Sequence, residues 1–417
     1  MAYSAKLTIN CNQDCTYCYE AVSRQENRHV GRQPGNEVDK LIQAVKDIDM
    51  TYAPNLHGGE PLLLPKKQIE KVLSEFYDMF SKKIIERKGK LDPDETVTSI
   101  QTNGSLIDDD HIEMFLKYKT AVGISIDGHE ELNDGRWMGN VEKTRKNTAK
   151  IIRNIQKLKE RGVPTSIIAV VNKHNGTKER IPKLKEFLLM MKNIGIINGR
   201  LNMIELDFPE LADQLQIPME EEIHFYQEMA PFLMENDLYY APFIDVVDSL
   251  LGFGYRTCVT TQCDPYHTLG ERPIYGDGTV GNCLRTSKDG TVFLAEKNGN
   301  ADRVSNERYS ILRQIPMSEG GCGGCKYWSI CNAHCPGSAE DGDWRNKSQH
   351  CESLYALYET TERAYKKMMP NLRLTTEKHN LSDNEMFNRI NNGTASDLVF
   401  SRMFEQTNDR GGRRGAY

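Results

Sequence analysis

Short apolar or mixed runs alternate with amphipathic stretches through the first half of the chain, and this alternation restricts the fold more than any other feature. The six runs are KLTIN, APNLH, VTSIQTNG, AVGISIDG, PTSIIAVV and GRLNMIEL. In the stretch KKQIEKVLSEFYDMF, apolar side chains recur at helical spacing at Ile69, Val72, Leu73, Phe76, Met79 and Phe80. Strand–helix alternation predicts parallel βα units, in which ligands bind at the carboxyl ends of the strands. With six such units, the expected fold is α/β, a partial (β/α)6 barrel of the TIM type.

Three cysteines follow the first run within CNQDCTYCYE, at Cys11, Cys15 and Cys18. Thiols this close together could belong to a disulfide framework, a zinc site or a metal-cluster loop. The sequence shows no secretory signal pattern and no apolar run of membrane-spanning length, so we expect a cytoplasmic protein, in which disulfides are rare. A structural zinc site takes four protein ligands, whereas this loop offers three, and His29 lies in a charged stretch further on. An iron–sulfur cluster is favoured, with one iron left open for a substrate or cofactor.

The formal net charge of the chain is −6, which argues against a general polyanion binder, and we expect neither nucleic acid nor a membrane as partner. A helix predicted to end at Gly162 is nevertheless basic. Its cations are Lys143, Arg145, Lys146, Lys150, Arg153, Lys157, Lys159 and Arg161. We expect this helix to be the solvated outside of the barrel, and a docking face for an acidic leader peptide or an acidic electron carrier is the alternative.

The spacing Cys-x3-Cys-x2-Cys, with Tyr17 before the last cysteine, resembles the signature of the radical S-adenosylmethionine (SAM) superfamily. Three later strand ends resemble further motifs of that family, in the right order along the chain. They are HGGEPLL with Gly58, Gly59 and Glu60, QTNG with Gln101 and Asn103, and SIDG with Ser125 and Asp127. The resemblance implies that these residues, Tyr17 and Arg136 contact SAM. Ser125 and Arg136 would lie near its ribose and carboxylate, and Glu60 or neighbouring carbonyls near its ammonium group.

The resemblance also implies the reaction. SAM would chelate the open iron of a [4Fe-4S] cluster, and the reduced cluster would donate one electron to break the sulfonium bond. The 5′-deoxyadenosyl radical would then abstract a hydrogen atom from the substrate. We therefore expect an enzyme. The alternative of another class is a non-catalytic iron–sulfur electron carrier, which would have no use for the SAM motifs.

The other eight cysteines lie between residues 258 and 351. Their spacing resembles the SPASM domain, an extension of radical SAM enzymes that modify peptides or proteins, whereas CGGC alone would favour a zinc ribbon. The resemblance implies one auxiliary cluster on Cys258, Cys263, Cys283 and Cys335, and a second on Cys322, Cys325, Cys331 and Cys351. With the first loop, three [4Fe-4S] clusters would use all eleven cysteines. Asp277-Gly278 is predicted to form a hairpin turn that presents Cys283.

The expected domains follow the changes in composition. Residues 1–215 are expected to form the partial barrel, 216–257 a helical linker, 258–365 the SPASM domain and 366–417 a polar, mobile tail. The basic end of the tail, RGGRRGAY, is expected to be solvated, and an arm that binds peptide or nucleic acid is the alternative.

The main functional hypothesis is a maturase of a ribosomally synthesised precursor peptide, acting at carbon by crosslinking, epimerisation or backbone excision such as tyramine splicing. The alternative is formylglycine formation, because the cysteine spacing also resembles that of anaerobic sulfatase-maturing enzymes. Their general base, however, is an Asp directly after the hairpin cysteine, where this chain has Leu284. The candidates for a proton donor or acceptor are Asp264, Asp277, Glu205 and Asp207.

Partners are expected from the same resemblance. Many peptide maturases carry a small winged-helix domain for leader binding ahead of the barrel, whereas here the first strand begins within ten residues of Met1. We expect leader recognition to depend on a separate small protein, or on the barrel and tail alone. A reductase or a flavodoxin-type protein is the expected electron donor.

Overall fold

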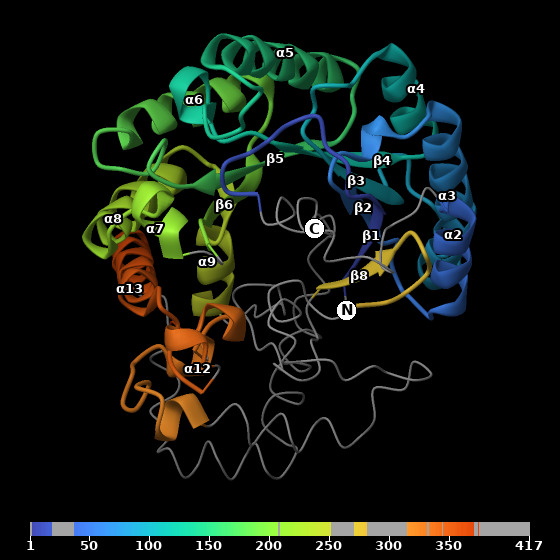
Figure 1. The fold of residues 1–417 in the computed structure, drawn as a ribbon. Coiled ribbons are helices and arrows are strands. Elements are labelled where there is room, and N and C mark those ends of the chain that lie inside the picture. The colour runs from blue at the N-terminus through green and yellow to red at the C-terminus, as the bar shows by residue number, and fades with distance from the viewer. Residues whose placement is uncertain are drawn as a thin grey trace, which may run out of the picture. The chain divides into compact units, whose positions relative to one another are not determined.

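Eight strands form one sheet in a computed structural model that describes residues 2–18, 37–206, 209–251, 271–281, 315–331, 333–343, 345–370 and 374. The strand order is β7-β6-β5-β4-β3-β2-β1-β8 (Figure 1). The strands are β1 (Ala2–Thr8), β2 (Asn55–Gly58), β3 (Thr98–Thr102), β4 (Thr120–Ser125), β5 (Thr165–Val171), β6 (Asn198–Met203), β7 (Tyr239–Ala241) and β8 (Glu271–Tyr275). The six strands expected from the sequence are confirmed, and β7 and β8 are additions to them.

The strands from β1 to β6 pair in parallel with their neighbours in chain order. Parallel neighbours require crossover connections, and helices supply them here. Five of these are α2 (Val38–Asp47), α3 (Lys66–Lys88), α4 (Asp109–Lys117), α5 (Val141–Glu160) and α6 (Ile181–Ile194). They lie along the outer face of the curved sheet (Figure 1). The α/β class with a parallel sheet is thus confirmed, and the carboxyl ends of β1 to β6 share one edge.

Packing between this sheet and its helices follows the expected periodicities. In β5, Ile167, Ala169 and Val171 are fully buried, whereas the residues between them are half-buried. On α3, the predicted apolar face is buried except for Met79, which is half-buried at its edge. The end predicted for α5 is also confirmed, since Gly162 follows the helix with a left-handed φ of 80°.

The strand β8 is one of the two strands that were not expected. It pairs in parallel with β1 over Ala2↔Glu271 to Lys6↔Tyr275. The sequence expectation placed residues 271–275 in a separate cysteine-rich region, whereas in the structure they belong to the unit that contains β1 to β6. Within a run as short as ERPIY, periodicity cannot reveal a partner strand at the other end of the chain.

The expected hairpin turn after β8 is confirmed. The N–H of Tyr275 donates to the carbonyl of Thr279 at 2.9 Å, and Gly278 adopts a φ of 85°, which favours glycine. The carboxylate of Asp277 accepts from both the N–H and the hydroxyl of Thr279, at 2.9 and 2.7 Å.

Residues 209–251 contain α7 (Pro209–Leu215), α8 (Met219–Glu235), the short strand β7 and α9 (Phe243–Leu251). The mainly helical character expected for 216–257 holds for the part up to residue 251, because the remainder lies outside the described residues. No helix in the described part of the chain combines the length and apolar character needed to cross a bilayer.

A second unit contains α9, α12 (Trp328–Cys331) and α13 (Cys351–Met368). Its core includes Tyr327, which stacks on Tyr358 with ring centroids 5.2 Å apart. The buried carboxylate of Glu362 accepts from the hydroxyl of Tyr327 and from the ammonium of Lys326, both at 2.6 Å. Beyond residue 370, the expected tail lies outside the described residues except for Leu374.

Candidate functional site: a thiol loop at the strand ends

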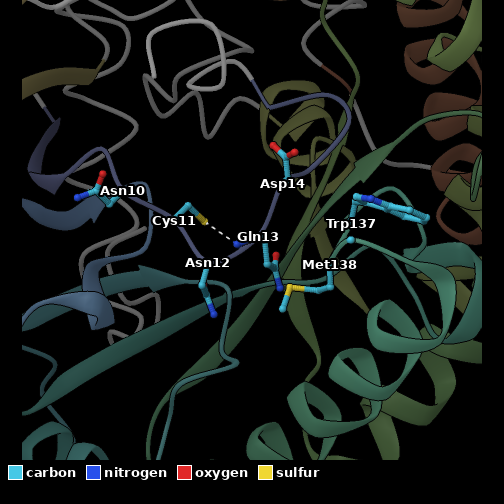
Figure 2. A pocket seen from close by; sticks show the side chains of 8 residues that line it. Asn10, Cys11, Asn12, Gln13, Asp14, Trp137 and Met138 are labelled. Carbon is cyan, nitrogen blue, oxygen red and sulfur yellow. Dashed lines mark hydrogen bonds between the residues drawn. The ribbon is translucent and has the colours of Figure 1, made fainter. Parts of the chain in front are cut away.

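The thiol loop, residues 9–18, leaves the carboxyl end of β1 and carries Cys11, Cys15 and Cys18. All three are half-buried and none is in a disulfide. The N–H of Gln13 lies 3.4 Å from the sulfur of Cys11 (Figure 2), and the N–H of Cys18 donates to the carbonyl of Cys15 at 3.1 Å. The loop therefore makes a tight turn between Cys15 and Cys18, and Cys11 lies four residues before this turn.

A pocket of about 530 Å³ lies against this loop. It is lined by Asn10, Cys11, Asn12, Gln13, Asp14, Trp137, Met138 and Gly139. Figure 2 shows the loop on one side and Trp137 and Met138, from the segment that follows β4, on the other. Two main-chain bonds join these segments, from the N–H of Asp14 to the carbonyl of Trp137 and from that of Thr16 to Gly135, both at 2.9 Å. Pockets of this size hold ligands with the dimensions of a nucleoside cofactor.

The glycines of HGGEP allow close packing between the end of β2 and the thiol loop. A Cβ on Gly58 would lie 2.2 Å from the carbonyl oxygen of Thr8, and one on Gly59 would lie 2.2 Å from that of Asn10. The N–H of Gly59 donates to Thr8 at 2.6 Å. The resemblance implied that these glycines contact SAM. In the structure, their lack of a Cβ allows the end of β1 and the start of the thiol loop to approach them closely.

The carboxylate of Glu60 ties β2 to β3. It is fully buried and accepts from the hydroxyl of Thr102 at 2.6 Å, from the N–H of Asn103 at 2.7 Å and from the N–H of Leu62 at 3.0 Å. Burial raises the pKa of this carboxyl group, while these hydrogen bonds act in the opposite direction.

The motif QTNG, at the end of β3, hydrogen-bonds to the thiol loop. The amide nitrogen of Asn103 donates to Asn12 at 2.8 Å and lies 3.9 Å from the sulfur of Cys11. The amide nitrogen of Asn12 in turn donates to Ser105 at 2.9 Å. Gln101 donates to the hydroxyl of Ser125 at 2.8 Å, which joins β3 to β4. Sequence motifs alone did not single out Asn12 and Ser105, although Asn12 lies between two of the cysteines.

Tyr17, Asp127 and Arg136 form a hydrogen-bonded set in which Asp127 and Arg136 are buried and Tyr17 is half-buried. The hydroxyl of Tyr17 donates to one carboxylate oxygen of Asp127, and the guanidinium of Arg136 donates to the other at 2.9 Å. That second oxygen also accepts from the N–H of Val170 at 2.9 Å. The guanidinium lies over the ring of Tyr17, 5.7 Å from its centroid. These residues were predicted to contact SAM; the structure shows that they contact one another.

The donors in this region fit a ligand that carries a carboxylate. Nε of Arg136 and Nε2 of Gln13 are buried and have no hydrogen-bond partner among the described residues. Burial raises the pKa of the Cys15 thiol to about 12, although the positive charge of Arg136 lowers it. Three free thiols, a nearby cation and two donors without partners match what a cysteine-ligated cluster and a carboxylate-bearing ligand would need.

The second unit holds another set of thiols, Cys322, Cys325, Cys331 and Cys351, none in a disulfide. Burial raises the pKa of Cys322 to about 11, and Cys351 and Cys325 raise it further. The pKa of Cys331 is also raised by burial and then by the other three. The four thiols therefore lie within electrostatic range of one another, which fits the ligand set predicted for one auxiliary cluster. Bound iron would reverse these shifts by deprotonating its ligands.

The structure describes only part of the other predicted cluster ligands and acid–base candidates. Cys335 is buried, whereas Cys258, Cys263, Cys283 and Leu284 lie outside the described residues. In the part of the chain that the structure describes, no three His, Cys, Asp or Glu side chains have the arrangement of a metal site. Of the acid–base candidates, Asp207 and Asp264 also lie outside. Glu205 is half-buried just beyond β6, at the same sheet edge as the thiol loop, and Asp277 stabilises the turn after β8.

The comparisons with known proteins agree with this geometry. The model of the Radical SAM superfamily matches residues 6–188. The cysteine-type anaerobic sulfatase-maturating enzyme of Clostridium novyi is 26% identical over 375 residues, which are 84% of this chain and 92% of that enzyme. The structure of native anSMEcpe with bound AdoMet and the Cp18Cys peptide has a TM-score of 0.65 at 17% identity, over 89% of this chain and 99% of that one.

A further structure with a similar fold is Streptococcus suis SuiB bound to the precursor peptide SuiA. Its TM-score is 0.52 at 16% identity, over 84% of this chain and 75% of that one.

Proposed function

We propose, from the premise that residues 6–188 form a radical SAM domain, that this protein is an enzyme that modifies a peptide by hydrogen-atom abstraction. A radical SAM domain uses SAM and a [4Fe-4S] cluster, which together supply a carbon radical able to remove hydrogen from an unactivated position. The observation that carries the proposal is the thiol loop, held by three strand ends against a pocket of about 530 Å³.

Residues of this chain would bind the cluster, fix the thiol loop and limit the access of water to the pocket. Cys11, Cys15 and Cys18 would hold the cluster beside the pocket, which Cys11 lines. Asn103 and Asp127 fix the loop through the side-chain hydrogen bonds described above. Glu60 fixes it through its backbone N–H, which donates to the carbonyl of Asn10 at 2.7 Å. Trp137 and Met138 line the opposite wall. An apolar wall reduces access of water to a reactive species, and water exclusion limits side reactions.

A peptide as substrate is supported by two observations. The relative from Clostridium novyi, similar over 92% of its length, is a sulfatase-maturating enzyme, which acts on a protein. The two solved structures of similar fold bind the Cp18Cys and SuiA peptides. The cysteines of the second unit would hold auxiliary clusters, which gives three clusters with SAM as the proposed cofactor set.

We propose two outcomes for the peptide. The first is a change at carbon in a ribosomally synthesised precursor: a crosslink, an epimerised centre or an excised unit such as tyramine. The second is oxidation of a Cys or Ser to formylglycine, and the similarity to sulfatase-maturating enzymes favours it. Against the second stands Leu284, where those enzymes have the Asp that accepts a proton.

The test uses the full chain, reconstituted anaerobically with iron and sulfide and reduced with dithionite. SAM cleavage to 5′-deoxyadenosine is the expected first result, and its absence in iron-loaded protein would end the proposal. Co-expression with candidate precursor peptides, followed by mass spectrometry in deuterated water, then separates the outcomes. A crosslink loses two hydrogens, an epimerised residue gains deuterium at Cα, an excision shortens the chain, and formylglycine reacts as an aldehyde.

Two partners complete the proposal. A cytoplasmic reductase or flavodoxin-type donor would supply the electron, and a separate small protein would bind the leader of the precursor. A pull-down in which the candidate small protein does not increase binding of the full precursor would count against the second partner.

A further inference from the structure

One helix of the barrel carries a line of exposed cations, which we call the cationic stripe: Lys143, Lys146, Lys150 and Arg153. All four are on α5 and all are exposed. Successive members are three or four residues apart, so their side chains share one face of the helix. The opposite face packs on the sheet through Ile151, Ile155 and Leu158, which are fully buried.

Within the described residues, no carboxylate forms an ion pair with the cationic stripe, and none of its four side chains makes a hydrogen bond. Other cations on and just after α5 are paired with neighbouring elements: Arg145 with Asp134 at 2.8 Å, Lys157 with Asp109 at 3.7 Å, and Arg161 with Glu113. Like charges at these spacings destabilise an isolated helix. In a chain with a net charge of −6, four adjacent cations without counter-charges are a local exception.

The cationic stripe begins beside the pocket. Trp137, Met138 and Gly139 line that pocket, Asn140 caps α5 by accepting from the N–H of Lys143 at 2.9 Å, and the helix starts at Val141. One residue, Asn140, separates the pocket lining from the helix, so Val141 lies at most about 7 Å from Gly139 along the chain. From Lys143 to Arg153 the helix rises by about 15 Å. The stripe therefore starts within a few residues of the pocket lining and continues along the helix.

We propose that the cationic stripe binds an acidic segment of the peptide substrate while the residue to be modified occupies the pocket. The inference rests on the proposed function for its peptide substrate. An extended segment of about five residues spans the length of the stripe, and carboxylates along it would face the four cations. Its chain would then continue toward the pocket, because Lys143 lies four residues after Gly139 of the pocket lining.

A linear partner fits better than an acidic electron carrier. The unpaired charge is a single row along one helix, and it ends at Arg153, because Lys157 and Arg161, which continue the row, already have carboxylate partners. A folded carrier would present a broad acidic surface, whose charges beyond the stripe would meet these neutralised pairs. Charge complementarity of this kind governs which partner binds and how fast.

The test compares two matched double variants of the iron-loaded full chain. Lys146→Glu with Lys150→Glu reverses the middle of the stripe. Lys67→Glu with Lys82→Glu is the control, because these lysines of α3 are equally exposed and also lack an ion-pair partner among the described residues. The probes are two fluorescent synthetic peptides of the same length, one with a run of Glu ahead of a Cys and one with Gln at those positions. Binding is measured by anisotropy.

Wild type should bind the Glu peptide more tightly than the Gln peptide, and added salt should reduce the difference, because exposed charges are screened. Reversing two charges should weaken binding of the Glu peptide by about tenfold or more, with little effect on the Gln peptide. Lys146→Gln with Lys150→Gln should give an intermediate value, and the α3 control should match wild type. Equal affinity of the stripe variant and wild type for the Glu peptide would overturn the proposal.

Peptide-free SAM cleavage separates this inference from the proposed function. The stripe variants should cleave SAM at the wild-type rate when dithionite is the reductant. If wild type cleaves no SAM, the proposed function fails while the binding result still stands. If instead the stripe variant binds the Glu peptide normally but loses SAM cleavage only with a flavodoxin as reductant, the stripe docks the electron carrier and the peptide inference is wrong.

Discussion

The hydroxyl of Tyr17 donates a hydrogen bond to the carboxylate of Asp127, which lies 110 residues later in the chain. Tyr17 lies between two of the loop's cysteines, and Asp127 is the second residue after β4. Because Arg136 holds the other oxygen of the same carboxylate, the three side chains form a connected set that fixes the thiol loop independently of any ligand.

This relationship predicts an effect of Asp127→Asn that precedes SAM binding. The variant loses the charge that Arg136 requires and an acceptor for Tyr17, so the loop should hold its cluster poorly. After anaerobic reconstitution we expect less iron than in wild type and an altered electron paramagnetic resonance signal of the reduced, SAM-free protein. Asp127→Ala should also destabilise the fold by about 3–5 kcal/mol, since it leaves a buried cation without its partner.

Tyr17→Phe is the matched control for this prediction, because it keeps the ring under Arg136 and removes only the hydroxyl. Its iron content should lie between those of wild type and Asp127→Asn. If both variants keep the wild-type SAM-free signal and lose only SAM affinity, the three residues act on SAM and not on the loop.

Removal of all three loop thiols should separate the first cluster from the auxiliary ones. The triple variant Cys11→Ala, Cys15→Ala and Cys18→Ala should lose about a third of the roughly twelve irons expected for three clusters, together with all SAM cleavage. Iron analysis and the residual cluster spectrum measure this. Stoichiometric zinc in place of iron in anaerobically purified wild type would contradict the assignment.

Gly59→Ala should disrupt the connection between HGGEP and the thiol loop. The added methyl group would overlap the carbonyl oxygen of Asn10 at 2.2 Å, so we expect a loss of about 1–3 kcal/mol or more in the free energy of unfolding, with reduced iron retention. Gly162→Asn is the control, because nothing lies within 4 Å of its added Cβ and Asn tolerates a left-handed φ. Equal denaturation midpoints for the two variants would contradict the prediction.

In the second unit, acid should loosen the packing around Tyr327. Burial opposes ionisation of Glu362, but hydrogen bonds from Lys326, Tyr327 and Lys366 lower its pKa from 4.5 to about 2. A lowered pKa contributes stability that is present above 4.5 and lost as the pH falls toward 2. Near-ultraviolet circular dichroism of the tyrosines should report this loss. In Glu362→Gln the dichroism should change less over the same pH range, and an unchanged profile would argue against this role.

Much of the barrel could be predicted, because alternation of apolar runs and amphipathic helices is a local signal. Ile167, Ala169 and Val171 alternate in β5 as the run PTSIIAVV indicated, and Ile69 to Phe80 follow one helix face. The partner of β1 on its outer side could not be predicted, since no local pattern in ERPIY specifies which distant strand it joins.

For the site, the sequence located the right strand ends but not the contacts between them. The predicted SAM residues Glu60, Asn103 and Asp127 all lie at the thiol loop. That they hydrogen-bond to the chain itself depends on rotamers and on the close approach of the glycines, which residue spacing does not encode. Asn12 and Ser105 were missed for the same reason, since Asn and Ser are common in loops of every kind.

The pairing of β1 with β8 has a consequence for the order of events during synthesis. Residues 2–6 leave the ribosome well before their partners at 271–275. Until those partners are made, β1 has β2 alone beside it, and the strand that carries the thiol loop is an open edge. Long-range pairing of this kind forms slowly, because the intervening chain must first be brought together. The outer side of the strand that carries the thiol loop is therefore paired only after the other strands of the sheet have been made.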